Sequence, residues 1–292
     1  MSAVERSVAG GSKIARIVIY TALLLCAVVY LVPLFVMVVT SLKSLDEVRD
    51  GNVLALPHDL TFAPWIKAWG EACVGLNCNG IKGYFWNSIL MVVPAVAIST
   101  LLGSLNGAVL TKWHFPGHKI VFGLMLFSCF IPFQVVLIPM AKILGLLGLA
   151  NARAGLILVH VVYGLGFTTL FFRNYYEAFP TELIRAAQMD GAVFSQIFRR
   201  ILLPASGPII VVTVIFQFTN IWNDFLFGAS FSSGETAPMM VALNNVVNTS
   251  TGVKEYNVHM AAAMIAALPT LLVYVLAGRY FVRGLMAGAV KG

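Results

Sequence analysis

Six long runs of apolar residues constrain this chain more than any other feature of its sequence. Each is close to the ~20 residues that a helix needs to cross the hydrocarbon core of a bilayer. Their approximate ranges are 17–40, 85–110, 120–140, 154–176, 204–228 and 258–282. Because backbone polar groups in hydrocarbon must be hydrogen-bonded within the protein, each run is expected to be helical. The sequence therefore predicts an all-α polytopic membrane protein with six transmembrane helices and one transmembrane domain, residues 1–292.

The distribution of Lys and Arg predicts how these helices are oriented. If the N-terminus is cytoplasmic, the inner segments hold 12 of the 19 Lys and Arg residues and the longer outer segments hold the other seven. The positive-inside rule then puts both termini and residues 181–204 in the cytoplasm. The net charge of +7 is spread over the loops, with no basic cluster interleaved with aromatic residues. We therefore expect membrane lipid, and not nucleic acid, as the charged partner.

The segment 181–204, between the fourth and fifth runs, is too polar to lie in hydrocarbon at low cost. Its charged residues are Glu182, Arg185, Asp190, Arg199 and Arg200. It is also too apolar for a solvated tether, so we expect a short amphipathic helix that stands off the membrane. The alternative is an ordinary loop helix that lies on the bilayer surface.

Local residues indicate where the helices of this segment begin and end. Thr181 is the expected N-cap, with the acidic Glu182 in the favourable first turn. Gly191 follows Asp190 and is expected to end the helix, since glycine tolerates a positive φ. A second helical piece is expected over residues 192–202, and Pro204 then opens the fifth apolar run.

The same segment resembles the EAA loop of the permeases of ATP-binding-cassette (ABC) importers. The matching residues are Ala186-Ala187, Asp190-Gly191-Ala192 and the ending Ile201-Leu202-Leu203-Pro204. The glutamate that opens the family motif is Arg185 here, and the nearest acid is Glu182. In that family the loop is a coupling helix that sits in a cleft of the cytoplasmic ATPase subunit. The resemblance implies an ATPase-coupling role for Glu182, Arg185, Ala186, Ala187, Asp190, Gly191 and Pro204.

A stripe of polar residues marks the fifth run. Thr213, Gln217, Asn220 and Asp224 recur at spacings that place them on one face of a helix. In lipid such a face must contact protein or water, so we favour a substrate pathway suited to a polyol. The alternative is hydrogen bonding between helices with no role for substrate.

Trp222 and Asn223 precede Asp224 in a Trp-Asn-Asp-Phe sequence that resembles a signature of sugar-importer permeases. They are therefore added to the candidate pathway. Trp222 could stack on a sugar ring, but a tryptophan at the membrane interface is an equally good interpretation.

Several other residues have simpler interpretations. Cys73 and Cys78 lie in an outer segment, where they are either a disulfide or two free thiols. Gly103 and Gly107 form a G-x-x-x-G pattern that favours close helix packing. His160 is interpreted as a packing residue, and no metal site is expected.

Taken together, these motifs resemble the carbohydrate-uptake class of ABC-importer permeases, and the stretch CVGLNCNGIKGYFWNS resembles the glucose/mannose type. The resemblance implies a subunit of the bacterial inner membrane that pairs with a second homologous permease. Two ATPase subunits that bind ATP and Mg²⁺ and a periplasmic sugar-binding protein complete the expected assembly.

This chain is expected to be a non-catalytic transport subunit with no cofactor of its own, because it has no G-x-x-x-x-G-K-[ST] phosphate loop. The main alternative is a secondary sugar transporter coupled to an ion gradient. Such transporters need ionisable groups inside the membrane, and the sequence offers only Asp224 and His160, with no evident charged partner for either.

Overall fold

The structure is a computed structural model that describes residues 13–49, 51–113, 115–248 and 253–289. Both chain ends, which the positive-inside count puts in the cytoplasm, lie outside these ranges. The described residues are helical and contain no strand, only an isolated bridge between Val74 and Asn77. The all-α prediction is therefore confirmed for the described part of the chain.

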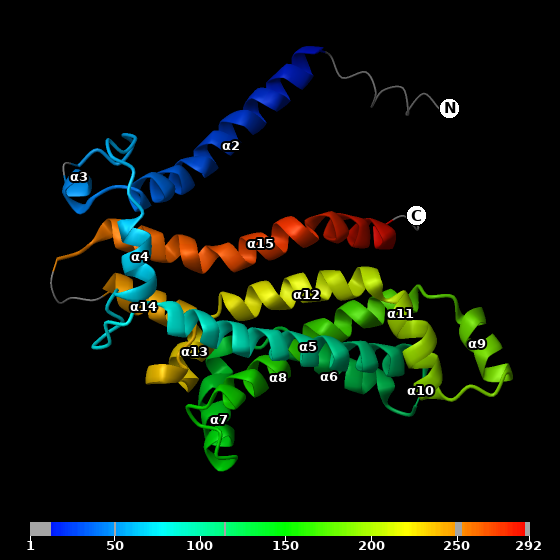
Figure 1. Cartoon of the computed structure of the whole chain (residues 1–292). Helices are drawn as coiled ribbons and strands as arrows, with labels where there is room; N and C mark the ends of the chain where they lie inside the picture. Colours follow the sequence, from blue (N-terminus) through cyan, green and yellow to red (C-terminus); the bar gives the residue numbers. More distant parts are fainter. Residues whose placement is uncertain (1–12, 50, 114, 249–252, 290–292) are drawn as a thin grey trace.

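Within the described ranges, four helices are long and apolar enough to cross a membrane. They are α2 (Lys13–Ser41), α5 (Lys82–Lys112), α8 (Arg153–Glu177) and α15 (Tyr256–Ala289). Figure 1 shows α5 and α8 side by side, with α15 on the far side of α12 (Gly207–Trp222) from them, while α2 diverges from α15 toward the N-terminus. These helices match the first, second, fourth and sixth predicted runs.

The other two predicted runs are not continuous helices. Residues 120–140 fall on α6 (His118–Ser128) and α7 (Phe133–Leu146), which meet at an angle of 105°. Pro132 stands at the start of α7, where its missing N–H costs no helical hydrogen bond. The described residues thus contain four continuous candidate spans, or up to six if each of two bent helix pairs is one span.

The fifth predicted run, 204–228, is also wrong in its bounds. Its long helix is α12 (Gly207–Trp222), which follows α10 (Phe194–Ile197), the π-helical segment η1 (Phe198–Leu202) and α11 (Leu203–Ala205) at a bend of 76°. Pro208 occupies the first turn of α12. The remaining helices are α3 (Leu45–Arg49), α4 (Ala63–Gly70), α9 (Thr181–Met189), α13 (Leu226–Phe231), η2 (Gly234–Thr236) and α14 (Met239–Asn248).

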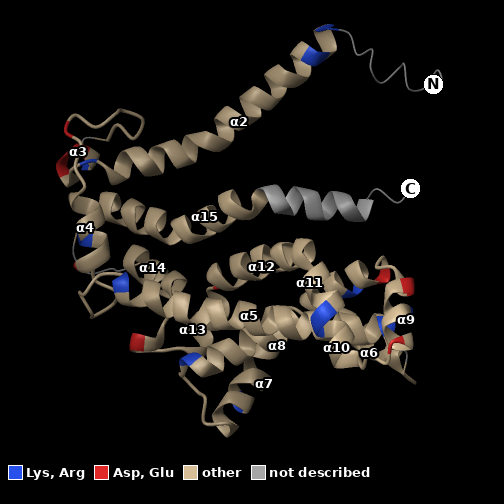
Figure 2. Ribbon diagram, turned by 45° about the vertical axis from the view of Figure 1, so that its right-hand side comes forward, with Lys and Arg blue, Asp and Glu red and all other residues tan. Residues whose placement is uncertain are grey.

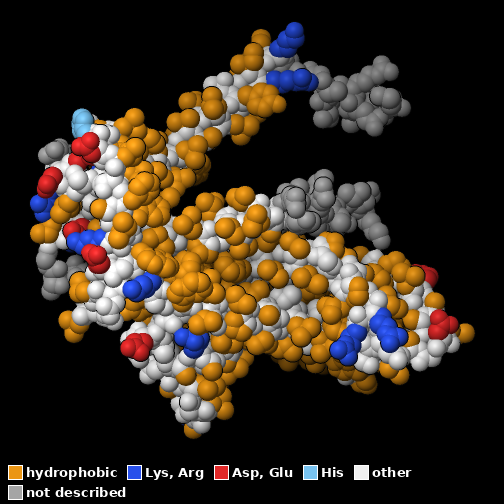
Figure 3. Space-filling view, viewed as in Figure 1, with side chains coloured by type: hydrophobic (Ala, Val, Ile, Leu, Met, Phe, Trp, Pro, Cys, Tyr) orange, Lys and Arg blue, Asp and Glu red, His pale blue; other side chains and the backbone are white. Residues whose placement is uncertain are grey.

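Charged side chains gather at the two ends of the long helices. Figure 2 shows them around α3 and α4 at one end and around α9 and α10 at the other, with few on the helices between. The space-filling view shows apolar side chains over this middle zone, including most of α2 (Figure 3). A charge-free middle zone is what a hydrocarbon core requires.

Helices α5 and α8 pack closely because α5 carries glycine at the contact. A Cβ atom built on Gly103 would collide with Thr168, and one on Gly107 would collide with Phe172 and the backbone of Arg173. The predicted role of the G-x-x-x-G pattern in helix packing is therefore confirmed.

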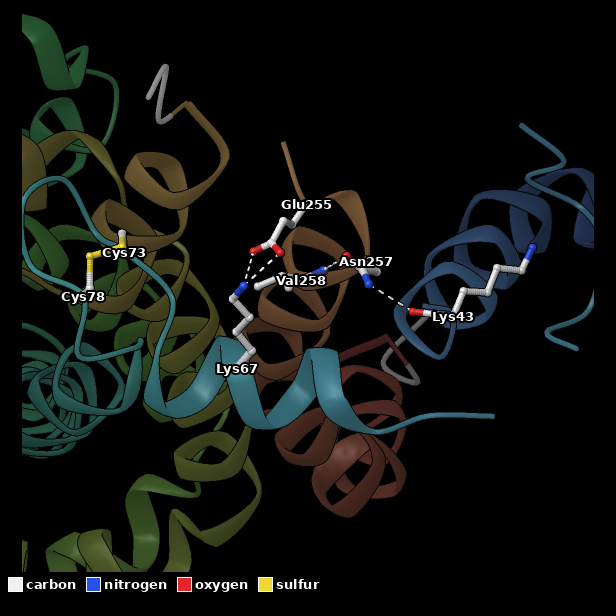
Figure 4. Close-up of polar contacts among 7 residues, drawn as sticks. All are labelled: Lys43, Lys67, Cys73, Cys78, Glu255, Asn257 and Val258. Atoms are coloured by element: carbon white, nitrogen blue, oxygen red, sulfur yellow. Dashed lines mark hydrogen bonds and ion pairs between the residues drawn. A yellow bond between two sulfur atoms is a disulfide. The ribbon is translucent and has the colours of Figure 1, made fainter. Parts of the chain in front are cut away.

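Polar contacts fasten α2 and α4 to the start of α15, as Figure 4 shows. The Asn257 side-chain amide donates a hydrogen bond of 3.0 Å to the backbone carbonyl of Lys43, and Lys67 pairs with Glu255 at 2.7 Å. A disulfide joins Cys73 and Cys78 in the loop after α4. These contacts make the α3–α4 end of the molecule one packed unit.

The α5–α8 contact predicts opposite effects for two glycines of the same helix. Gly107→Ala forces the helices apart and is expected to destabilise the protein by about 1–3 kcal/mol. Gly83→Ala, at a site with nothing within 4 Å of the added Cβ, is expected to be neutral or to stabilise by up to about 1 kcal/mol. Thermal unfolding of the purified protein in detergent measures both, and equal effects would contradict the packing.

Candidate functional site

A cavity of about 660 Å³ lies between α8, α12, α13 and the break between α6 and α7. This volume is in the range of small-molecule sites. Aromatic side chains make up much of its wall, and a small number of polar side chains converge on it. The polar side chains that line it include His160, Tyr163, Gln217, Thr219, Asn220, Asn223 and Asp224.

The break between α6 and α7 forms one wall of this cavity, through Cys129 and Phe133. Non-helical backbone is tolerated at membrane depth where protein buries it or where it lines a cavity. The Tyr163 hydroxyl donates a hydrogen bond to the carbonyl of Ile131 in the break, and the Tyr163 ring stacks on Phe133 with centroids 4.4 Å apart. Tyr163 therefore hydrogen-bonds a backbone carbonyl of the non-helical segment, and its ring packs on the first residue of α7.

The predicted polar stripe of the fifth run divides into two parts. Gln217 and Asn220 line the cavity; the Gln217 amide also donates to the Ser99 hydroxyl at 3.2 Å. Thr213 is fully buried outside the cavity lining, and its hydroxyl donates to the carbonyl of Ile209 at 2.8 Å. Gln217 and Asn220 thus remain candidates for the pathway, and Gln217 also bonds between helices, whereas the Thr213 hydroxyl bonds within α12 itself.

Trp222 lies in the core and not at the cavity. Its side chain is 1% exposed, and its ring N–H donates to the carbonyl of Ala266 at 2.9 Å. It stacks on Phe218 and meets Phe85 edge-on. Both sequence-based interpretations of Trp222, a sugar platform and an interface belt, are therefore wrong in this structure, where it joins α12 to α15 and α5. Its neighbour Asn223 does line the cavity.

Asp224 caps the turn that leads into α13. Its carboxylate oxygens accept hydrogen bonds from the backbone N–H groups of Phe227 and Gly228 at 3.3 and 3.1 Å. One oxygen also lies 3.8 Å from Nε2 of His160 on α8, which is beyond hydrogen-bonding reach. The cavity therefore brings together an acidic and a basic side chain from separate helices.

His160 is the site residue that sequence reasoning missed. It is 5% exposed and lines the cavity, and its Nε2 atom is buried without a hydrogen-bond partner. A packing histidine would have a satisfied ring nitrogen. No spacing rule could have linked it to Asp224, because the two residues meet only through tertiary packing.

Helix α9 presents one apolar face to the protein and another away from it. Ile184 is 3% exposed and joins a buried cluster with Phe198 and Leu202. Leu183 and Met189 are 52% and 88% exposed. Ala187 packs partly against the buried cluster, whereas Ala186 is exposed, as are Glu182, Arg185 and Asp190. The helix is thus anchored through Ile184 and leaves apolar side chains free on its outside.

The predicted C-terminal end of α9 is confirmed, and its predicted N-terminal cap is wrong. Gly191 has a φ of +82°, and its N–H donates to the carbonyl of Gln188 at 3.0 Å, so the predicted glycine turn is confirmed. Thr181 is not the N-cap: it is the first residue of the helix, no side chain caps that end, and the Thr181 hydroxyl accepts a 3.4 Å bond from Lys112. Pro180, whose fixed φ suits the position, takes the place predicted for Thr181.

The second half of the segment is irregular. The helical piece expected over residues 192–202 is divided into α10 and the π-helical η1, and Pro204 lies in α11, one turn before the bend into α12. Single π turns are frequent at functional sites. Among the described residues, no group of three His, Cys, Asp or Glu side chains could hold a metal ion.

A family model and individual relatives place this chain in the same family. Residues 99–286 match the model of the family described as "Binding-protein-dependent transport system inner membrane component". A probable ABC transporter permease of Pyrococcus horikoshii is 39% identical, over 95% of this chain and 98% of the relative.

Two permeases of sugar importers are also similar in sequence to this chain. The xylose/arabinose import permease of Haloferax volcanii is 30% identical over 89% of this chain and 88% of its own length. The glucose import system permease of Saccharolobus solfataricus is 30% identical over 94% of this chain and 95% of its own length.

The fold is shared with a solved transporter. A chain of a bacterial ABC transporter involved in the import of alginate superposes with a TM-score of 0.80. The likeness covers 93% of this chain and 99% of that chain, at 22% sequence identity. At this identity the likeness concerns the fold alone.

The anchoring of α9 predicts a contrast between adjacent residues. Ile184→Ala leaves a cavity in the buried cluster and is expected to cost about 2–5 kcal/mol. Leu183→Ala, on the exposed side, is expected to stay within about 0.5 kcal/mol of the wild type. Thermal unfolding and limited proteolysis of the 181–204 segment measure the difference. Equal protease resistance in both variants would show that α9 does not depend on Ile184.

Proposed function

Because the chain belongs to the family of inner-membrane components of binding-protein-dependent transport systems, we propose that it is one permease subunit of an ATP-driven sugar importer. It pairs with a second, homologous permease in the cytoplasmic membrane of a bacterium, with both termini in the cytoplasm. Relatives that import xylose, arabinose and glucose support a sugar as the substrate.

The cavity supports a neutral polyol as the transported molecule. Its polar side chains include the amides of Gln217, Asn220 and Asn223, which both donate and accept hydrogen bonds, as sugar hydroxyls do. Its aromatic walls suit the apolar faces of a sugar ring. In this proposal the pathway residues are Gln217, Asn220, Asn223 and Asp224. Trp222 joins α12 to α15 and α5, and Thr213 is buried outside the cavity lining.

The exposed apolar face of α9 is the observation that carries the coupling role. Leu183 and Met189 are exposed at the end of the molecule where charged side chains gather, and α9 is anchored to the rest of the protein by Ile184. We place this face against a cytoplasmic ATPase subunit. Closure of the ATPase pair then moves α9, and η1 and the bend before α12 carry the movement to the cavity.

The other partners follow from the same assembly. Two ATPase subunits bind ATP and Mg²⁺, since this chain has no phosphate loop. A periplasmic sugar-binding protein docks at the α3–α4 end. The exposed apolar side chains of α2, among them Leu24 and Tyr30, face lipid or the second permease.

A secondary transporter coupled to an ion gradient is the second candidate. The approach of His160 to within 3.8 Å of Asp224 favours it, because paired ionisable groups inside a membrane are typical of proton relays. Family membership argues against it, and so does the exposed apolar face of α9, which such a transporter has no need of.

Leu183→Asp tests the docking role of α9. The change adds a charge at an exposed position, so the chain is expected to fold, while the apolar contact with the ATPase subunit is lost. We expect the amount of ATPase subunit that co-purifies with the permease pair, and its ATP hydrolysis, to fall at least roughly tenfold, as for the loss of a central interface residue.

Leu76→Asp is the matched control, because Leu76 is a fully exposed leucine in the loop between α4 and α5, and α4 lies at the opposite end of the molecule from α9 (Figure 1). This variant is expected to retain its ATPase subunits. Full retention of the ATPase subunits by Leu183→Asp would contradict docking through this face of α9.

A further inference from the structure

One polar atom at the cavity has no hydrogen-bond partner in the part of the chain that the structure describes. Nε2 of His160 is buried and makes no hydrogen bond, although the side chain lines the cavity. An unsatisfied buried polar atom costs about 1–3 kcal/mol, so such atoms persist where a ligand or an ordered water completes them.

Asp224 supplies a second polar atom at the same place. The Asp224 oxygen nearest His160 lies 3.8 Å from Nε2 and already accepts a bond from the Gly228 N–H. A carboxylate oxygen has capacity for more than one hydrogen bond. The spacing is too long for a direct bond, so each group can bind a hydroxyl that lies beside the pair.

The surroundings hold this pair in place. His160 and Tyr163 both meet the Phe227 ring edge-on, with centroids 5.7 and 5.4 Å away. Phe227 is fully buried, and its own N–H binds Asp224. The aromatic cluster thus fixes both polar groups before any ligand arrives, which lowers the cost of binding.

We propose that His160 and Asp224 form a hydroxyl-binding subsite of the sugar pathway within this subunit. The inference rests on the proposed function and deepens it, by assigning substrate specificity to a pair of residues on α8 and at the end of α12. Adjacent hydroxyl groups of one sugar ring bind the pair, one to Nε2 of His160 and the other to the Asp224 carboxylate. Phe225, which lines the cavity and is 41% exposed, offers its ring to the apolar face of the sugar.

The test uses the complete complex in proteoliposomes, with ATP and the sugar-binding protein, and D-glucose as the probe. His160→Ala is expected to lower ATP-driven glucose uptake roughly five- to tenfold, the effect of losing one hydrogen bond to a hydroxyl. His259→Gln is the matched control, since His259 is a partly buried histidine of α15 outside this cavity, and it is expected to leave uptake unchanged.

Monodeoxy analogues of glucose separate recognition from a structural effect. One analogue should be carried more slowly than glucose by the wild type, yet at the same rate by the wild type and by His160→Ala. Asp224→Asn should give the same pattern for an adjacent position of the ring.

Three results overturn the inference. If His160→Ala slows glucose and every analogue equally, the residue holds a water or packs the helix. If His160→Ala and Asp224→Asn carry glucose as fast as the wild type, the pair does not contact the sugar. If the assembled wild-type complex shows no ATP-driven uptake, the proposed function fails and the inference with it.

Discussion

The absence of water from the hydrocarbon core is the constraint on which this structure depends. It confines charged side chains to the two ends of the molecule and obliges the long segments between them to be helical. Where the helices break, at residues 129–132, the exposed backbone is bonded by Tyr163 and faces a cavity. The sharper of the two bends among the described helices, 105° between α6 and α7, thus coincides with the candidate pathway.

The cavity and α9 lie in different parts of the molecule, and α12 connects them. The cavity sits near α13, toward the α3–α4 end, whereas α9 projects from the opposite end (Figure 1). Helix α12 runs between them, from the bend after α11 to Trp222, two residues before Asp224. Its packing through Trp222 onto α15 makes it a stiff connection, and the bend before Gly207 is where it can turn. In our account, movement of α9 changes the cavity through this helix.

The sequence predicted what local chemistry controls. The length of the apolar runs predicted four of the long helices. Gly191 predicted the turn after α9, and Gly103 and Gly107 predicted close helix packing, which the α5–α8 contact confirms. It could not predict what tertiary packing decides. The stripe on α12 has the right period for a pathway, yet Thr213 is buried outside the cavity lining and Trp222 enters the core, because the neighbours of a helix are not encoded in its own periodicity. The sequence did not assign His160 to the candidate site for the same reason. Its approach to Asp224 depends on how α8 packs against the residues that follow α12.

The energy source for uptake tests the central claim most directly. The permease pair, its ATPase subunits and the sugar-binding protein are reconstituted in proteoliposomes, and sugar uptake is followed with ATP present and all ion gradients abolished by ionophores. The account predicts uptake that requires ATP and the binding protein and is unchanged by the ionophores. Uptake by this chain alone, driven by a proton or sodium gradient without ATP, would show instead that it is a secondary transporter.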